Sequence, residues 1–309
     1  MRIKYKNFSD RLASNDHGLI RRLVFKLVKK HIAGSTTASV IRTVKQLNDK
    51  GVSATVTFLN ENAETPLKVR YNINSYSEII RQLSRLNLNA EISLRLSQLG
   101  YLSNKEQAVS ALDEIATVAD KYKIKLWLES EEAIVQGNIF DVRDRYDGTR
   151  GIGVEVPMDY MFKYTNGSIP KSVLSYKDIK LMTMAVSQNA GKQKAAGKSE
   201  KRGKDSTSLY YKCITELAGN DVETTVFSHD EKMLSKLMDD SKSYKKHLRF
   251  EVPLGYNRKR FGMMLKSNQK MSVYVAYGKD WIPYAINKLT EGRIRDIAKT
   301  VLDGEAGGK

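Results

Sequence analysis

Charged and aromatic side chains recur at or just after short apolar runs in this sequence. The set comprises Arg95, Glu129, Glu155, Lys180, His229, Glu251 and Tyr277. A charge at the end of a buried strand must be paired or must face a polar ligand, because its isolated burial costs several kcal/mol. These residues are therefore the candidates for chemistry. A purely structural layer of ion pairs is the alternative, and His229 is either a ligand contact or a histidine with structural partners.

The apolar runs that carry these residues are rich in β-branched residues and alternate with longer amphipathic segments. Eight runs are expected to be strands, at residues 52–59, 90–96, 124–129, 151–157, 179–186, 222–228, 247–253 and 271–277. Eight successive βα units predict an α/β fold, a (β/α)8 TIM-type barrel whose strand ends share one mouth. A doubly wound open sheet is less favoured, because neither G-x-G-x-x-G after the first strand nor G-x-x-x-x-G-K-[ST] is present.

Helical segments fill the intervals between these strands and also precede the first one. The clearest are residues 105–122 and 281–301, whereas residues 158–176 make a poor helix. Two further helices are expected at residues 19–31 and 37–50, the second ending at Gly51. We expect residues 1–51 to form an N-terminal helical cap on the barrel bottom, and residues 52–309 to form the barrel.

Composition fits a folded, water-soluble chain of one or two domains. The 309 residues include 52 Lys and Arg against 35 Asp and Glu, a net charge of +17, and one cysteine. Because Cys213 is alone, it excludes an intramolecular disulfide and a Cys-based zinc site, and no metal is expected. A reducing, cytoplasmic location is expected, because the cysteine is alone and the residues at 1–32 lack the continuous apolar run of a signal peptide. The positive charge would attract nucleic acid, a phosphate-bearing ligand or the periphery of an anionic membrane.

A basic segment interrupts the pattern after the fifth strand. Residues 188–205 contain six Lys and Arg among Gly, Ala and Ser, with few large apolar side chains. Such a composition cannot contribute much to a core. We expect a mobile, solvated loop, with a lid or an arm for anions as the alternative, since loops of this kind border barrel active sites.

The C-terminal motif is the most specific feature of the chain. Residues 273–284 read Val-Tyr-Val-Ala-Tyr-Gly-Lys-Asp-Trp-Ile-Pro-Tyr, and Lys-Leu-Thr-Glu follows at 288–291. This stretch strongly resembles the last strand and helix of proline dehydrogenases, FAD-dependent barrel enzymes of proline catabolism. Earlier parts of the chain resemble other parts of the family and occur in the family's order. They are residues 32–34, 46–51, 92–100, 227–230, 250–251 and 255. The resemblance spans most of the chain and is weakest at residues 160–176 and 188–205.

The resemblance implies hydride transfer from proline to FAD, which gives pyrroline-5-carboxylate, and onward transfer of electrons to a quinone or another acceptor. By resemblance, the cofactor-binding residues are Leu128, Glu155, Lys180, Thr183, Met184, Ala185, Ser228 and His229. The substrate-binding residues so implied are Arg95, Tyr277, Asn287 and Lys288. Lys180 and Tyr277 are the implied catalytic residues.

Several positions depart from the family pattern. The family usually has Lys at Arg95, Asp at Trp127, Gln at Glu155 and Glu251, Arg at Lys180, and two arginines at Asn287 and Lys288. An ionised Glu can only accept hydrogen bonds, so Glu155 and Glu251 suit a flavin only if they pair with a cation or carry a proton. The alternative function is an altered or inactive barrel that binds an anionic partner such as RNA. Because no RNA-binding motif is present, nucleic acid is less favoured as a partner.

Overall fold

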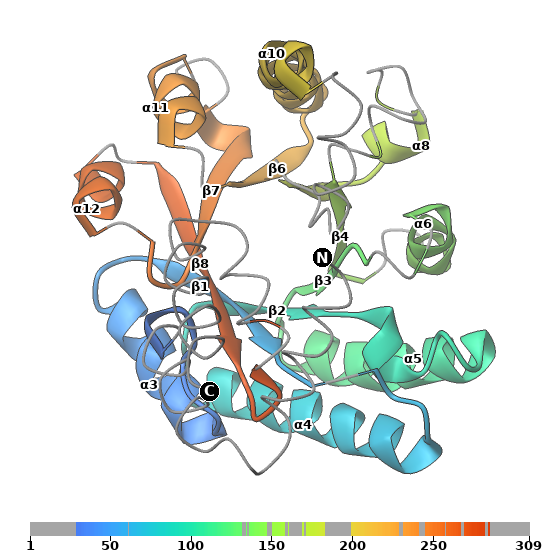
Figure 1. Cartoon of the computed structure of the whole chain (residues 1–309). Coiled ribbons are helices and arrows are strands. Elements are labelled where there is room, and N and C mark those ends of the chain that lie inside the picture. Colours follow the sequence, from blue (N-terminus) through green and yellow to red (C-terminus); the bar gives the residue numbers. More distant parts are fainter. Residues whose placement is uncertain are drawn as a thin grey trace, which may run out of the picture.

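A computed structural model describes residues 29–60, 62–131, 134, 136–146, 150–157, 160, 169, 171–182, 199–228, 231–240, 245–256, 258–266, 269–281 and 284. Eight parallel strands close into a barrel, because each pairs with the next and β8 pairs with β1 (Figure 1). The strands are β1 (Ser53–Phe58), β2 (Ala90–Leu94), β3 (Leu126–Leu128), β4 (Ile152–Pro157), β5 (Asp178–Met182), β6 (Glu223–Phe227), β7 (Leu248–Pro253) and β8 (Lys270–Tyr277). The predicted (β/α)8 barrel is thus confirmed over the open sheet.

Helices surround the closed sheet (Figure 1). They are α3 (Thr37–Asn48), α4 (Pro66–Arg85), α5 (Lys105–Lys121), α6 (Gln136–Asp144), α8 (Lys171–Leu174), α10 (Ser199–Gly219), α11 (Glu231–Asp240) and α12 (Arg258–Lys266). Short 3-10 turns are η2 (Lys29–His31), η3 (Leu96–Leu99) and η6 (Lys245–His247). Helix α5 corresponds to the helix predicted at residues 105–122, whereas most of the helix predicted at 281–301 lies outside the described residues.

Local capping explains where the long helices begin. Thr65 is the N-cap of α4, where its side chain accepts from Lys68 N and Pro66 occupies the first turn. Asn104 caps α5 in the same way and accepts from Gln107 N at 3.0 Å. Both helices then bury one apolar face against the sheet. Their capped starts lie at the same end of the barrel as the C-termini of the strands.

The N-terminal helices are described only in part. Helix α3 has a reciprocal capping box between Thr36 and Ser39, and it buries Val40, Val44 and Leu47. It packs against β8, β1 and α4, so it lies at the side of the barrel in the ring of helices. Of the helix expected at residues 19–31, only η2 lies within the described residues. The division of the chain into a cap at 1–51 and a barrel therefore stays a prediction.

The basic segment at residues 188–205 differs in part from the predicted loop. Its last seven residues belong to α10, which begins at Ser199. Glu, Lys and Arg are good helix formers, and the helix continues into a face that buries Tyr210, Ile214 and Leu217. Residues 188–198 lie outside the described residues. Within the described part of the chain, no helix has the length and apolar character needed to cross a membrane.

The barrel has an apolar outer layer and a polar interior. Along each strand, side chains alternate between the helices outside and the barrel axis inside. Outward residues such as Val56, Ile92 and Val154 belong to the main apolar core. Inward residues include Glu155, Lys180 and Glu251, which are at most 4% exposed. Because most barrels fill this interior with branched apolar side chains, the buried charges mark it as the place to look for a site.

Candidate active site

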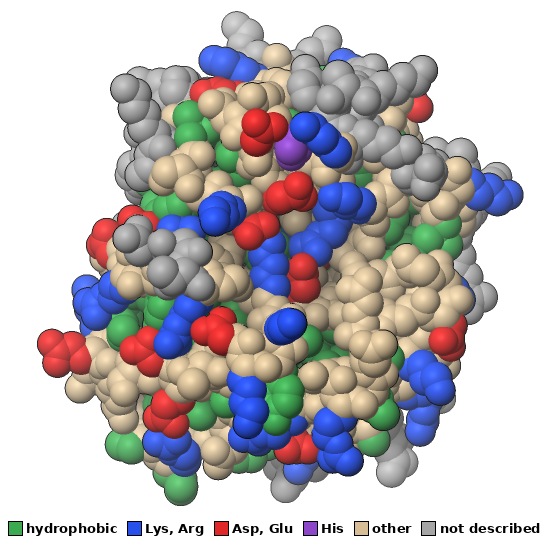
Figure 2. Space-filling model, turned by 180° about the vertical axis from the view of Figure 1, so that it is seen from behind, with side chains coloured by type: hydrophobic (Ala, Val, Ile, Leu, Met, Phe, Trp, Pro, Cys, Tyr) green, Lys and Arg blue, Asp and Glu red, His purple; other side chains and the backbone are tan. Residues whose placement is uncertain are grey.

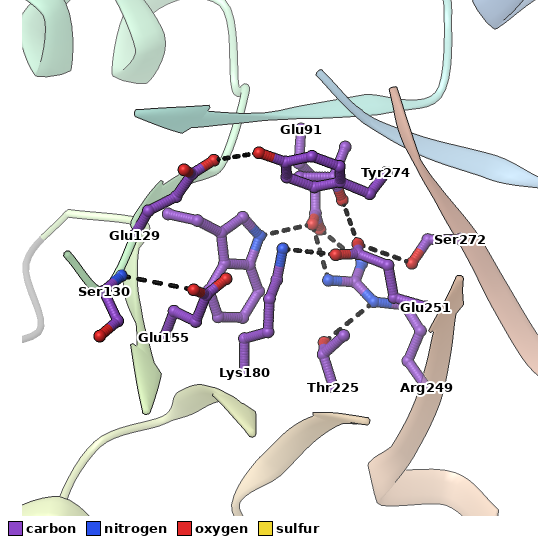
Figure 3. A network of polar contacts seen from close by, with 12 residues as sticks. Glu91, Glu129, Ser130, Glu155, Lys180, Thr225, Arg249, Glu251, Ser272 and Tyr274 are labelled. Atoms are coloured by element: carbon purple, nitrogen blue, oxygen red, sulfur yellow. Dashed lines mark hydrogen bonds and ion pairs between the residues drawn. The ribbon is translucent and has the colours of Figure 1, made fainter. Parts of the chain in front are cut away.

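An ion pair closes the lower end of the barrel interior, which is the end where the strands begin. The guanidinium of Arg249, the second residue of β7, donates from two nitrogens to the Glu91 carboxylate, each at 2.7 Å (Figure 3). Trp127 Nε1 donates to Glu91 at 2.7 Å, and Arg249 Nε donates to Thr225 at 3.1 Å. Burial would raise the pKa of Glu91, but the two bonds and the charge of Arg249 lower it overall. Glu91, Trp127 and Arg249 thus have hydrogen-bond partners in this layer, and we assign the layer a structural role.

Trp127 fills the space above this ion pair because Gly153 on the neighbouring strand has no side chain. A Cβ at Gly153 would lie 2.5 Å from the Trp127 ring. Three cations surround the indole, with Lys125, Lys180 and Arg249 at 4.5, 5.0 and 5.7 Å from its ring centre. Trp127, which departs from the family pattern, is therefore a packed core residue that separates the lower layer from the mouth.

The middle layer is an ion pair between Lys180 and Glu251, whose side chains are both fully buried. Lys180 Nζ lies 2.6 Å from Glu251 Oε1. Glu251 also accepts hydrogen bonds from Thr55 and, at 3.0 Å, from Ser272. A buried carboxylate with one cation and two hydroxyl donors is well satisfied, so Glu251 meets the condition that it pair with a cation.

Glu155 lies beside this pair with weaker support. Its carboxylate accepts one long hydrogen bond, from Ser130 N at 3.4 Å (Figure 3). Burial, followed by the negative charge of Glu129, raises the pKa of Glu155 to about 8, although Lys180 acts in the opposite direction. This upward direction is the one that the other condition, a protonated carboxyl, requires.

Arg95, Glu129 and Tyr274 form a cluster at the strand C-termini. Tyr274 OH donates to Glu129 Oε1 at 2.7 Å, and Arg95 Nε lies 3.8 Å from Glu129 Oε2. Burial and the charge of Glu129 raise the pKa of Tyr274 well above its usual value, so the phenol stays protonated. Arg95 Nε is buried without a hydrogen-bond partner among the described residues. The Arg95 side chain as a whole is 31% exposed, so the accessible part of its guanidinium suits an incoming carboxylate.

Gln98 ties the loop that carries Arg95 to the loop that follows β1. Its Nε2 donates to the carbonyls of Phe58 and Asn60, at 2.7 and 3.2 Å, and its Oε1 accepts from Tyr76 OH at 2.6 Å. The same Oε1 accepts from Arg95 N at 3.2 Å. One buried amide thus joins the loop after β1, the loop after β2 and helix α4, which holds the Arg95 backbone in place.

The predicted site residues divide into three groups. Arg95, Glu155 and Lys180 line the polar interior together, and Ser228 follows β6, where its backbone N donates to Glu251 O at 3.3 Å. The side chain of Leu128 belongs to the apolar core, on the face of β3 opposite Trp127 and Glu129. Outside the described residues lie Thr183, Met184, Ala185, His229, Asn287 and Lys288.

Tyr277 requires a correction of its expected place. Its ring lies 5.3 Å from the ring of Phe58, in the apolar core, on the face of β8 opposite Tyr274. Tyr274 is the tyrosine of β8 that faces the barrel interior, and the prediction missed it. Strict alternation along residues 272–277 could have separated the two tyrosines, because 272, 274 and 276 share one face.

Comparison with known proteins agrees with the barrel and the motif. No family model matches the sequence. Proline dehydrogenase 1 of Bacillus subtilis strain 168 is 24% identical over 270 residues, which cover 85% of this chain and 86% of the relative. Proline dehydrogenase 2 of the same strain is 24% identical over 272 residues, 85% of each chain. The chain is a homologue of the proline dehydrogenases. The family resemblance indicated by the sequence motifs is confirmed.

Solved structures of proline utilization A (PutA) share the fold. The enzyme of Bdellovibrio bacteriovorus, inactivated by N-propargylglycine, aligns with a TM-score of 0.75 at 14% identity, over 89% of this chain and 33% of its own. A PutA mutant of Bradyrhizobium japonicum aligns with a TM-score of 0.65 at 15% identity, over 86% of this chain and 31% of its own. The proline dehydrogenase homologue described here spans about a third of these longer chains.

Proposed function

We propose that this proline dehydrogenase homologue is a flavin-dependent oxidoreductase that oxidises L-proline, or a related cyclic amino acid, to pyrroline-5-carboxylate. The observation that carries the proposal is the cluster of Arg95, Glu129 and Tyr274, which opens at the strand C-termini of a barrel of this family. Bound FAD would supply the hydride acceptor, and the electrons would pass on to a quinone or another acceptor.

The polar interior fits such a cofactor. A flavin ring presents carbonyl oxygens and ring nitrogens, so its site needs neutral donors and few unpaired negative charges. Glu251 is paired with Lys180 at 2.6 Å, and burial raises the pKa of Glu155, which favours the neutral form of that side chain. We propose Glu155, Lys180 and Ser228 as parts of the cofactor shell, together with the backbone near Leu128, residues 183–185 and His229.

The substrate carboxylate would be held by Arg95, with Asn287 and Lys288 as further proposed contacts. Glu129 fixes the orientation of both Arg95 and Tyr274, because it contacts each of them. Tyr274 takes the substrate-contacting role that the motif alone assigned to Tyr277. The buried hydroxyl and guanidinium then position the ring of the substrate, while Trp127 and the layer beneath it exclude water from below.

A barrel that binds RNA through its basic surface is not favoured. Its relatives are proline dehydrogenases, and the face seen from behind in Figure 2 mixes positive and negative side chains at its middle. We place the protein in the cytoplasm, with contact at an anionic membrane periphery as an option that its net charge of +17 allows.

The absorption spectrum of the purified protein, supplied with FAD and then freed of excess ligand, tests this proposal. Retention of yellow, protein-bound flavin that denaturation releases would support the assignment. A colourless protein that also fails to bind FAD in a titration would contradict it.

A further inference from the structure

Glu155 shares the barrel interior with two other glutamates, Glu129 and Glu251, and each of those two has a cation beside it. Glu129 has Arg95 within 3.8 Å, and it also accepts from Tyr274. Glu251 has Lys180 at 2.6 Å. With all three carboxyls ionised, this buried group would carry a net negative charge. Burial of an unbalanced charge is expensive, and the usual response of a protein is to neutralise it.

Lys180 could pair with the carboxylate of either Glu155 or Glu251. It is the register partner of Glu155 on the adjacent strand, so a direct pair across β4 and β5 would be the simplest arrangement. Its ammonium instead lies against Glu251 on β7 (Figure 3). Thr55 and Ser272 complete the hydrogen bonding of that carboxylate. Lys180, the cation next to Glu155 on the adjacent strand, is therefore already paired with Glu251.

Glu155 faces charged groups from three other strands. Glu129 follows β3, Lys180 lies on β5 and Glu251 lies on β7. Two of these groups are negative, and the positive one is bound to Glu251. The hydrogen bond from Ser130 N, at 3.4 Å, is too long to compensate for a buried negative charge.

We propose that the folded protein holds one proton on Glu155 at neutral pH, so that the barrel interior presents a carboxylic acid O–H as a neutral hydrogen-bond donor. Within the group formed by Glu129, Glu155, Glu251, Arg95 and Lys180, two carboxylates then balance two cations. Such a donor selects a ligand group that accepts a hydrogen bond, such as a ring carbonyl, over one that donates. The identity of that ligand rests on the proposed function, whereas the proton does not.

Burial and the neighbouring carboxylates raise the pKa of Glu155 to about 8, in agreement with this geometry. An unfolded glutamate loses its proton near its ordinary value of 4.5. Between pH 4.5 and about pH 8, Glu155 keeps its proton in the folded state and loses it on unfolding. The stability due to this proton is therefore fully present below pH 4.5 and is lost as the pH rises to about 8.

Proton release on unfolding tests the proposal in the apoprotein. Wild type and Glu155→Gln are unfolded at about pH 7 in weakly buffered denaturant with an indicator dye, and wild type should release about one proton more. Glu91→Gln is the matched control. Because Glu91 is paired as a carboxylate with Arg249 and is not among the charged groups that face Glu155, its substitution should leave proton release unchanged although it destabilises the protein.

Equal proton release from wild type and Glu155→Gln would overturn the proposal. If that variant does not fold, infrared spectra of folded wild type decide the question instead. A protonated carboxyl band that disappears as the pH is raised from about 6 to about 9.5 supports the proposal, and the lack of such a band overturns it. Neither measurement uses flavin or proline, so failure of the proposed function gives a different result from failure of this inference.

Discussion

Tyr274 and Glu129 meet inside the barrel, where the phenol hydroxyl donates to Glu129 Oε1 at 2.7 Å. The contact joins the last strand to the end of the third one, and the same carboxylate lies 3.8 Å from the Arg95 guanidinium. A single carboxylate therefore sets the positions of both proposed substrate contacts.

Tyr274→Phe should lower kcat/KM for L-proline about tenfold or more, because a hydrogen bond to a charged group contributes about 1.5 to 3 kcal/mol. Tyr277→Phe is the matched control on the opposite face of β8. Its ring packs against Phe58, so its kcat/KM should stay within about twofold of wild type. Steady-state kinetics of both variants check this, and a larger loss in Tyr277→Phe would reverse the assignment of the two tyrosines.

Gln98→Leu should reduce the free energy of unfolding by about 2 to 5 kcal/mol, since it leaves buried groups of Tyr76, Asn60 and Arg95 without their partner. Urea denaturation measures the loss. Gln82→Leu, on the outer side of α4, removes only an exposed hydrogen bond to Glu78 and should change stability by less than about 0.5 kcal/mol. Equal effects of the two substitutions would show that Gln98 does not hold the loops.

Arg249→Met should cost about 3 to 5 kcal/mol of stability at neutral pH, because it leaves Glu91 buried without its cation. Burial raises and Arg249 lowers the pKa of Glu91, with a net decrease. Its pairing therefore stabilises wild type above the ordinary value of 4.5, and this contribution is lost as the pH falls below it. Urea unfolding at about pH 7 and about pH 3 should show the gap between wild type and variant shrinking in acid; a gap of constant size would contradict this pairing.

FAD affinity should depend on pH through Glu155. Its raised pKa, about 8, implies that the proposed donor is lost above that value, so wild type should bind FAD up to about tenfold more weakly per additional pH unit. Glu155→Gln keeps a neutral donor and should show a flat profile over the same range. Flavin fluorescence titrations measure both, and parallel profiles would exclude a role for this proton in binding.

Periodicity predicted much of the fold. The β-branched runs identified all eight strands, and the lack of phosphate-loop motifs correctly favoured the barrel. The composition of the basic segment predicts a loop through residue 205, whereas α10 begins at Ser199, because Glu, Lys and Arg are also good helix formers.

The site was less accessible to sequence reasoning. Arg95, Glu155 and Lys180 stood out as charges at strand ends, but their pairing depends on distances across the barrel that no local pattern contains. Lys180 pairs with Glu251 and not with its register neighbour Glu155. Motif position alone points to Tyr277, whereas the two-residue alternation of the strand places Tyr274 on the inner face.

Anaerobic mixing of the FAD-loaded protein with L-proline tests the central claim most directly. Hydride transfer from proline would bleach the absorption of oxidised flavin and would yield pyrroline-5-carboxylate in an amount equal to the flavin reduced. The account predicts both changes, and it predicts that Tyr274→Phe slows the bleaching. A flavin that stays oxidised in the presence of saturating L-proline and related cyclic amino acids, in a folded and FAD-loaded protein, would contradict it.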